Sequence, residues 1–220
     1  MTVALVTGGN RGIGLACAQR LRESGHTVVV GCRSGIAPDG LFAVAMDVSD
    51  AESINAAFET IEEQHGPISV VVANAGITRD NLLMRMSDED IDEVLATNLA
   101  GSIRIARRAL RNMLKARSGR IILVSSVVGL MGSAGQVNYA ASKAGLVGVA
   151  RSLAREVDDA DLVGVDDAGA AHPVADDAFA DFHVEVDDLS GDWLGGVLAE
   201  ECAAVDERRE EVADDGGCLP

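Results

Sequence analysis

The residues best suited to chemistry in this sequence are Tyr139 and Lys143, which lie four positions apart in the segment GQVNYAASKAG, residues 135–145. At that spacing, both side chains lie on one face of a helix, one turn apart. An ammonium group favours the phenolate form of a neighbouring tyrosine, whose free pKa is ~10, so that proton exchange nearer neutral pH becomes possible. The alternative is a helix pair whose tyrosine only packs. The elements around the segment decide between the two.

A glycine-rich turn lies at the start of the chain. Residues 3–7, VALVT, form a short apolar run typical of a strand buried on both faces, and residues 8–14, GGNRGIG, open a helical pattern. Glycines at Gly8, Gly12 and Gly14 would let the backbone approach a pyrophosphate, while the helix N-terminus favours its negative charge. Strand, turn and helix together predict dinucleotide binding.

The end of the second expected strand, residues 27–32, bears on which dinucleotide is bound. An acidic residue at this place usually meets a free ribose 2′-hydroxyl. This chain has Cys32, Arg33 and Ser34 instead, and Arg11 lies in the glycine-rich turn. Two guanidinium groups would suit a 2′-phosphate, which predicts NADP in preference to NAD. The alternative for each arginine is a solvated surface charge.

The rest of the first 157 residues continues the alternation of strand and helix. Strands are expected at 41–46, 68–73 and 121–124, with helices to about 64, from about 88, over 98–117 and from the Tyr139 segment to about 157. Ser49 and Glu52 form a capping box for the first of these helices. Asp47–Val48, Asn74–Gly76 and Ser125–Ser126 each follow a strand. The order predicts an α/β fold, a Rossmann-like doubly wound parallel sheet that binds ligands at the carboxyl ends of its strands.

Composition limits the classes of protein that remain. The 220 residues are 48% hydrophobic, enough for one domain with a sizeable core, and no apolar run reaches the ~18 residues of a membrane span. The chain starts on a strand pattern, which leaves no room for a signal peptide. The four cysteines show neither metal-ligand nor disulfide spacing. We expect a cytoplasmic protein without a metal, a membrane or a nucleic acid as partner.

The helix expected over 98–117 is apolar on one face and basic on the other. The basic residues are Arg104, Arg107, Arg108, Arg111, Lys115 and Arg117. Such a face is either an ordinary solvated surface or a docking patch for an acidic partner.

Taken together, residues 1–157 resemble the short-chain dehydrogenase/reductase family. The resemblance rests on TGGNRGIG at 7–14, NAG at 74–76, a serine before the helix, and Tyr139 with Lys143, all in the family's order and spacing. Within the family, the stretches 74–86 and 135–146 are most similar to β-ketoacyl-[acyl carrier protein] reductases of fatty acid biosynthesis.

The resemblance implies an enzyme and assigns its residues. It implies NADPH-dependent reduction of a 3-oxoacyl thioester by a catalytic tetrad of Asn98, Ser126, Tyr139 and Lys143; the family's serine lies 13 residues before the tyrosine, which selects Ser126 over Ser125. In this scheme, Tyr139 protonates the developing alkoxide, Ser126 hydrogen-bonds the same oxygen, Lys143 holds the nicotinamide ribose, and Asn98 supports a water. The implied cofactor-binding residues are Gly8, Asn10, Arg11, Gly12, Ile13, Gly14, Arg33, Asp47, Val48, Asn74, Ala75, Gly76, Tyr139 and Lys143.

The resemblance also implies partners. The end of the basic face, at Lys115 and Arg117 with the neighbouring arginines, matches where such reductases meet the acyl carrier protein. The family assembles as a homotetramer. Two alternatives stay open: a short-chain reductase for an acyl-CoA, a sugar or a small ketone, and a non-catalytic dinucleotide-binding protein.

Residues 158–220 depart from the family. Residues 1–157 hold 16 lysines and arginines against 15 aspartates and glutamates, whereas 158–220 hold 2 against 20. Ala, Gly, Asp, Val and Glu make up 46 of these last 63 residues, and the family's sixth strand with its Pro-Gly ending is not found. We expect the C-terminal strands to be missing or aberrant. The segment would be an acidic, disordered tail, or an out-of-frame reading of a GC-rich gene, since these residue types share codons that begin with G.

Overall fold

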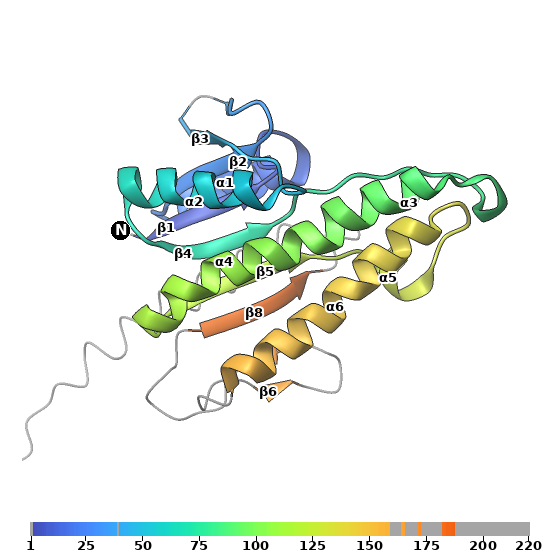
Figure 1. The fold of residues 1–220 in the computed structure, drawn as a ribbon. Helices are drawn as coiled ribbons and strands as arrows, with labels where there is room; N and C mark the ends of the chain where they lie inside the picture. The colour runs from blue at the N-terminus through green and yellow to red at the C-terminus, as the bar shows by residue number, and fades with distance from the viewer. Residues whose placement is uncertain (1, 39, 159–163, 166–170, 173–181, 188–220) are drawn as a thin grey trace, which may run out of the picture. The chain divides into compact units, whose positions relative to one another are not determined.

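The computed structural model describes residues 2–38, 40–158, 164–165, 171–172 and 182–187, all within one compact unit, Met1–Asp188. The centre of the described part is a six-stranded sheet in the order β3-β2-β1-β4-β5-β8, with every neighbouring pair parallel. Its strands are β1 Val3–Thr7, β2 Thr27–Cys32, β3 Phe42–Ala45, β4 Ile68–Ala73, β5 Gly119–Val124 and β8 Phe182–Asp187. A two-residue pair, β6 Gly164–Val165 and β7 Ala171–His172, is antiparallel. The doubly wound α/β fold class is confirmed (Figure 1).

Helices connect the strands and cover the sheet. They are α1 Gly12–Glu23, α2 Ala51–His65, α3 Asp88–Val94, α4 Gly101–Ala116, α5 Val127–Met131 and α6 Val137–Asp158, with a 3₁₀ turn η1 Leu83–Arg85 and a π-helical segment η2 Leu95–Ala100. The longer helices follow the order expected from the sequence, whereas η1 and α5 were not expected. The start near Asp88 is as expected, and the Ser87 side chain accepts a hydrogen bond from the Asp90 N–H there.

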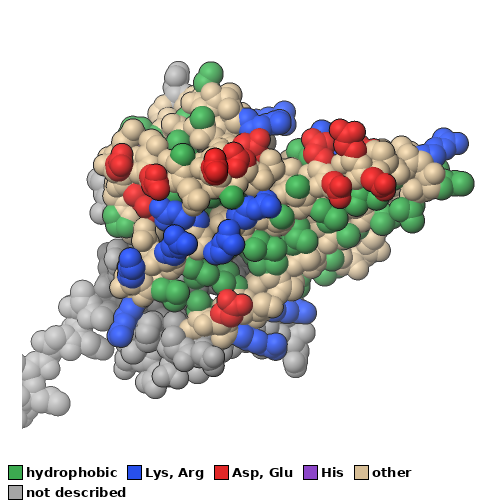
Figure 2. Space-filling model, viewed as in Figure 1, with side chains coloured by type: hydrophobic (Ala, Val, Ile, Leu, Met, Phe, Trp, Pro, Cys, Tyr) green, Lys and Arg blue, Asp and Glu red, His purple; other side chains and the backbone are tan. Residues whose placement is uncertain are grey.

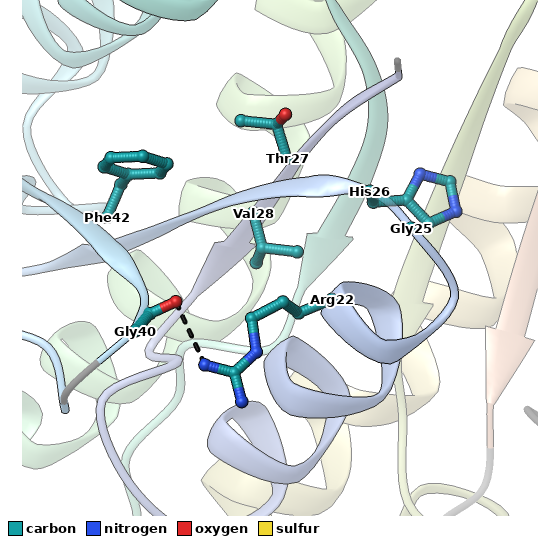
Figure 3. Close-up of a pocket in the computed structure, with 7 residues that line it drawn as sticks. All are labelled: Arg22, Gly25, His26, Thr27, Val28, Gly40 and Phe42. Atoms are coloured by element: carbon teal, nitrogen blue, oxygen red, sulfur yellow. Dashed lines mark hydrogen bonds between the residues drawn. The ribbon is translucent and has the colours of Figure 1, made fainter.

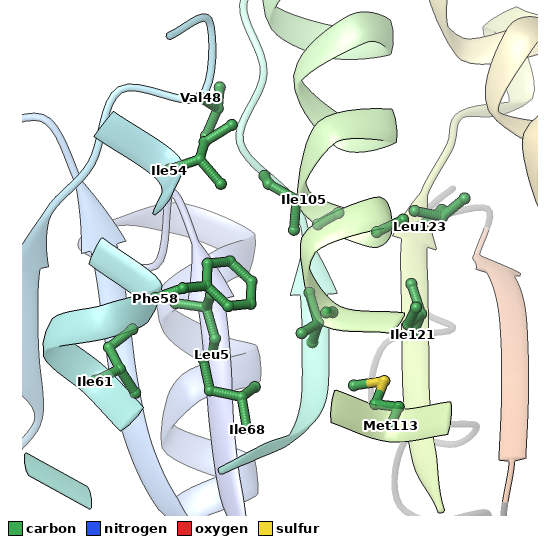
Figure 4. Close-up of a cluster of buried hydrophobic side chains, with 14 of the residues drawn as sticks. Leu5, Val48, Ile54, Phe58, Ile61, Ile68, Ile105, Met113, Ile121 and Leu123 are labelled. Atoms are coloured by element: carbon green, nitrogen blue, oxygen red, sulfur yellow. The ribbon is translucent and has the colours of Figure 1, made fainter. Parts of the chain in front are cut away.

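The main core lies between the sheet and the helices α2, α4 and α6. Figure 4 shows Leu5 of β1, Phe58 of α2 and Ile105 of α4 in this cluster, all at most 1% exposed. Burial of one such side chain stabilises the fold by ~1.5–3 kcal/mol. Ala4 and Val6 alternate with Leu5, so they face the opposite side of the sheet, where α1 packs on β1 and β2.

Two helix starts differ from the expectation. The N-cap of α2 is Asp50, whose carboxylate accepts the Glu52 N–H at 3.0 Å, and not Ser49. Ser49 lies one residue before this cap, and its N–H and hydroxyl donate to Asp47 Oδ1, at 2.9 and 2.6 Å. The second difference is at Asn98, which lies inside a continuous helical run from α3 through η2 to α4, not at a helix start. Short π-helical segments, which have more residues per turn than an α-helix, often occur at functional sites.

One described strand of the sheet lies beyond residue 158, in the segment whose strands were expected to be missing or aberrant. The strand β8, Phe182–Asp187, extends the sheet beside β5, with Gly119 paired to Phe182 and Val124 to Asp187. Its sequence, FHVEVD, alternates apolar and polar residues with the period of a half-buried strand. The acidic doublets on either side of this segment obscure that signal. Most of the expected acidic tail lies outside the described residues.

Candidate active site

The turn between β1 and α1 has the geometry of a phosphate cradle. Gly8 and Gly12 have φ angles of 65° and 56°, a region that side chains rarely adopt. A methyl group on Gly14 would collide with the Asn74 side chain and lie 2.6 Å from the Gly8 carbonyl oxygen. The first turn of α1 contains no acidic residue, and Arg11 makes no side-chain cap there. The N–H groups at this helix start therefore suit an anion.

Thr7 joins this cradle to the end of β4, a role that the sequence analysis missed. The side chain is fully buried, and its Oγ1 accepts the N–H groups of Asn74 and Ala75, both at 3.1 Å. Asn74 Nδ2 returns a hydrogen bond to the Thr7 carbonyl at 3.0 Å. The Asn74–Gly76 turn is thereby fixed beside the glycine-rich turn. A hydroxyl residue ending an otherwise apolar strand was the available signal.

Arg33 and Asp47 lie after β2 and β3, at the same edge of the sheet. Arg33 and Arg11 are both exposed. The pKa of Asp47 is lowered, mainly by the hydrogen bonds from the Ser49 hydroxyl and N–H, and to a smaller extent by the charge of Arg33. The two residues that were predicted to hold the 2′-phosphate side and the adenine side of a dinucleotide are thus electrostatically coupled.

Tyr139 and Lys143 lie on α6, as the spacing predicted. The Lys143 Nζ donates to the carbonyl of Val124, the last residue of β5, at 2.6 Å and lies 5.7 Å from the centroid of the Tyr139 ring. Lys143 is 5% exposed, and this burial lowers its pKa to about 8. Burial thus brings the titration of this ammonium closer to neutral pH, beside the only tyrosine of the sequence.

The two serines after β5 do different things. Ser125 is buried, and its hydroxyl donates to the carbonyl of Lys143 at 2.8 Å, which fixes α6 against the strand. Ser126 is half-buried and caps α5, with its Oγ accepting the Val128 N–H at 3.3 Å. Because the oxygen is the acceptor in this hydrogen bond, the Ser126 hydroxyl hydrogen can donate to a ligand.

Both the oxygen and the nitrogen of the Asn98 side chain form hydrogen bonds within the protein. Its Oδ1 accepts the Ile77 N–H at 2.8 Å, and its Nδ2 donates to the Ile77 carbonyl at 2.9 Å and to Ser142 Oγ at 3.1 Å. Ser142 in turn donates to the Tyr139 carbonyl at 2.7 Å. Asn98 therefore connects the turn after β4 to the backbone of Tyr139 through Ser142, a link that the sequence analysis did not identify.

Gly129 sets the distance between α5 and α6, which gives a first prediction. A methyl group there would lie 2.7 Å from the Ala144 nitrogen and 2.9 Å from the carbonyl carbon of Lys143, so the backbone beside Lys143 would have to move. Gly129→Ala is expected to lower the free energy of unfolding by ~1–3 kcal/mol in chemical denaturation.

The matched control for this prediction is Gly148→Ala, on the outer side of α6. A methyl group at Gly148 meets nothing within 4 Å, so the same substitution there is expected to stabilise by ~0.5–1 kcal/mol through helix propensity. Equal effects of the two substitutions would contradict close α5–α6 packing at Lys143.

Fewer basic residues of α4 are free for docking than the sequence predicted. Arg108 donates to both carboxylate oxygens of Glu62, at 3.1 and 2.8 Å, and its guanidinium lies 4.9 Å from the centre of the Phe58 ring. It holds α2 to α4 and is not available for docking. Arg104 donates to the Ser49 carbonyl at 3.3 Å. Arg107, Arg111 and Lys115 of α4 are exposed. Figure 2 shows basic side chains gathered on this face of the molecule.

A cavity of about 310 Å³ lies away from all of these residues, and Figure 3 shows the side chains that line it. Its lining includes Thr27, at the amino end of β2, and Arg22, whose Nη1 donates to the Gly40 carbonyl at 3.0 Å. Parallel sheets bind ligands at the opposite, carboxyl edge. We therefore place the candidate site at the carboxyl edge and not in this cavity.

Other classes of site find no support in the part of the chain that the structure describes. There, no group of three or more His, Cys, Asp or Glu side chains is arranged to hold a metal ion. Among the same residues, no helix is both long enough and apolar enough to cross a membrane.

A parallel sheet with a glycine-rich cradle and a Tyr–Lys helix at its carboxyl edge defines a Rossmann-like protein. The chain belongs to the short chain dehydrogenase family, which it matches over residues 2–166. It is 53% identical over 135 residues to the 3-oxoacyl-[acyl-carrier-protein] reductase MabA of Mycobacterium avium, an alignment covering 61% of this chain and 53% of that protein. It is 50% identical over 145 residues to the reductase FabG of Vibrio harveyi, and 41% over 148 residues to FabG of Escherichia coli (strain K12); each alignment covers 62% of this chain and 59% of the relative. The chain thus spans a little over half the length of these relatives.

Proposed function

We propose that the protein is an NADPH-dependent reductase that converts a 3-oxoacyl thioester on acyl carrier protein to the 3-hydroxyacyl thioester in fatty acid biosynthesis. The observation that carries the proposal is the position of Lys143, which is buried against the end of β5 and lies beside the Tyr139 ring. The names of the relatives supply the substrate class. A cytoplasmic location stays a prediction from the cysteine pattern.

The residues of the site divide the chemistry between them. A bound nicotinamide would supply the hydride that reaches the keto carbon. The Tyr139 phenol donates its proton to the oxygen that gains negative charge, and general-acid help of this kind contributes typically ~10²–10⁴ in rate. The Ser126 hydroxyl donates to the same oxygen, and the Lys143 ammonium stabilises the phenolate that remains. Asn98 holds this arrangement through Ser142; its support of a water stays a prediction.

The carboxyl edge fits a phosphorylated dinucleotide. The glycine-rich turn, with Gly8, Asn10, Gly12, Ile13 and Gly14, would hold the pyrophosphate at the start of α1. Arg11 and Arg33 would meet the 2′-phosphate, where an acidic side chain would repel it. Asp47 and Val48 would face the adenine, and Asn74, Ala75 and Gly76 would line the path to the nicotinamide.

The experiment that tests the proposal measures cofactor oxidation by the full chain. We expect oxidation of NADPH faster than of NADH when acetoacetyl-CoA or an acetoacetyl carrier protein is added, and little with a sugar lactone or a simple ketone. Tyr139→Phe is the control. Binding of NADPH without turnover would instead support a non-catalytic dinucleotide-binding protein.

Docking of the acidic carrier protein on α4 gives a second prediction. Replacing both Arg107 and Arg111 by Glu is expected to raise KM for the carrier-linked substrate roughly tenfold, which is ~1.4 kcal/mol, and to leave KM for the CoA-linked substrate within about twofold. Both arginines are exposed on the free part of the face. Arg20→Glu, at an exposed arginine of α1, is the control. A parallel rise for both substrates would contradict docking at this face. Homotetrameric assembly, implied by the resemblance, is part of the proposal.

A further inference from the structure

Asn138, the residue immediately before Tyr139, uses its whole amide group to fasten the start of α6. It is 3% exposed. Its Nδ2 donates to the carbonyls of Arg79 and Asp90, at 3.1 and 3.2 Å, and its Oδ1 accepts the N–H of Tyr139 at 2.8 Å. Both amide hydrogens and one acceptor position are therefore engaged, in three directions.

The Asp90 carbonyl belongs to the first turn of α3, and the Arg79 carbonyl belongs to the segment that connects β4 to α3. Around Asn138, the same segment is joined to the turn before α6: the Asn81 N–H donates to the Gly135 carbonyl at 2.9 Å, and Gln136 Nε2 donates to Asp80 Oδ2, also at 2.9 Å. Of these contacts, those of Asn138 are the buried ones. They fix the connection after the Asn74–Gly76 turn to the first turn of α6.

Tyr139 depends on this fastening because of its place in the helix. The first N–H groups of a helix have no partner within it, and the carbonyl four residues before Tyr139, that of Gly135, already accepts the Asn81 N–H. Asn138 Oδ1 supplies the missing acceptor. Ser142 and Asn98 hold the carbonyl side of the same residue. The backbone of Tyr139 is thus held at both its N–H and its carbonyl by buried side chains.

We propose that Asn138 is a positioning residue for the reaction: it clamps the helical turn that carries Tyr139 to the β4–α3 connection and to the first turn of α3, so that the phenol stays in place beside the Lys143 ammonium. The inference rests on the proposed function for its kinetic consequence, while the clamp itself is a statement about the position of Tyr139. Misplacement of a reacting group by ~1 Å can lower turnover roughly 10²-fold.

Asn138→Ala removes all three hydrogen bonds and is expected to lower kcat for acetoacetyl-CoA reduction roughly 10²-fold, with KM for NADPH within about twofold. Asn138→Asp keeps the acceptor for the Tyr139 N–H but loses both donors, so kcat is expected to fall here too. Asn112→Ala is the matched control, because it removes an asparagine whose Nδ2 bonds Glu62 Oε1 at 2.7 Å, away from α6. Its kcat is expected to stay near that of the wild type.

A spectroscopic readout separates the clamp from the activity. The sequence contains one tyrosine, so protein labelled with 3-fluorotyrosine gives a single ¹⁹F resonance that reports on Tyr139. We expect Asn138→Ala to shift or broaden this resonance and Asn112→Ala to leave it unchanged. An unchanged resonance in Asn138→Ala overturns the proposal, whatever the kinetics show. If the wild type reduces no thioester, the proposed function fails while the resonance still decides whether Asn138 positions Tyr139.

Discussion

Tyr139→Phe is expected to lower turnover of a 3-oxoacyl thioester by roughly 10²–10⁴-fold and to leave the Kd for NADPH within about twofold. The substitution removes one hydroxyl group and keeps the ring, which lies 5.7 Å from the Lys143 Nζ. The proton for the nascent alkoxide then has to come from water or from Ser126, whose hydroxyl is a much weaker acid than a phenol. Stopped-flow oxidation of NADPH with acetoacetyl-CoA measures the first quantity, and fluorescence titration of NADPH the second.

Ser126→Ala provides the comparison for this prediction. It removes a donor to the same substrate oxygen and the cap of α5, but it keeps the acid, so a smaller loss of turnover is expected than in Tyr139→Phe. If Tyr139→Phe kept more than about a tenth of the wild-type turnover, another group would be the acid and the assigned role of Tyr139 would be wrong.

Contacts within a few residues of each other were readable from the sequence, whereas contacts between distant segments were not. The Tyr139–Lys143 helix and the glycine-rich turn follow from local spacing alone. Thr7, by contrast, meets Asn74 across 67 residues, and Asn138 meets Arg79 across 59, so their roles depend on how the strands assemble. A hydroxyl or an amide in an apolar setting indicates that a partner exists but not which one.

The arginines of α4 also show that the sequence does not tell which distant segment a side chain contacts. Helical spacing placed Arg107 and Arg108 together on the basic side, but it could not tell which of them turns toward α2. The structure gives Glu62 and the Phe58 ring to Arg108 and leaves Arg107 in solvent. The sequence also offered two adjacent residues as the N-cap of α2. The cap is Asp50, and Ser49 donates to Asp47 instead.

The free energy of unfolding of the wild type, relative to that of Lys143→Met, is expected to rise by roughly 3 kcal/mol between about pH 8 and pH 10.5. Burial lowers the pKa of Lys143 from 10.5 to about 8 in the folded protein. Between these two pH values, the unfolded chain binds a proton that the folded chain does not, and stability rises with pH wherever the unfolded state binds more protons. Below pH 8 both states are protonated, so the penalty for burying the ammonium is then fully present.

Urea denaturation of both proteins at several pH values between 7 and 10.5 measures this difference, because the other titrating groups are common to the pair. The sequence contains one other lysine, Lys115, which is exposed on α4, so Lys115→Met is the matched control. Its difference from the wild type is expected to vary far less with pH. A flat difference for Lys143→Met as well would mean that the ammonium is solvated, contrary to its 5% exposure.

The same proton links stability to catalysis. The charged form of Lys143 is the one that stabilises a phenolate at Tyr139, yet it is the form that burial disfavours. Burial of the charged Lys143 beside the Val124 carbonyl and the phenol therefore lowers the free energy of unfolding at neutral pH. If the cation is needed for turnover, kcat for thioester reduction falls as pH rises through about 8, over the range in which the protein becomes more stable. Opposite slopes of activity and stability in one pH range would be the signature of Lys143, since a group that served folding alone would not change kcat.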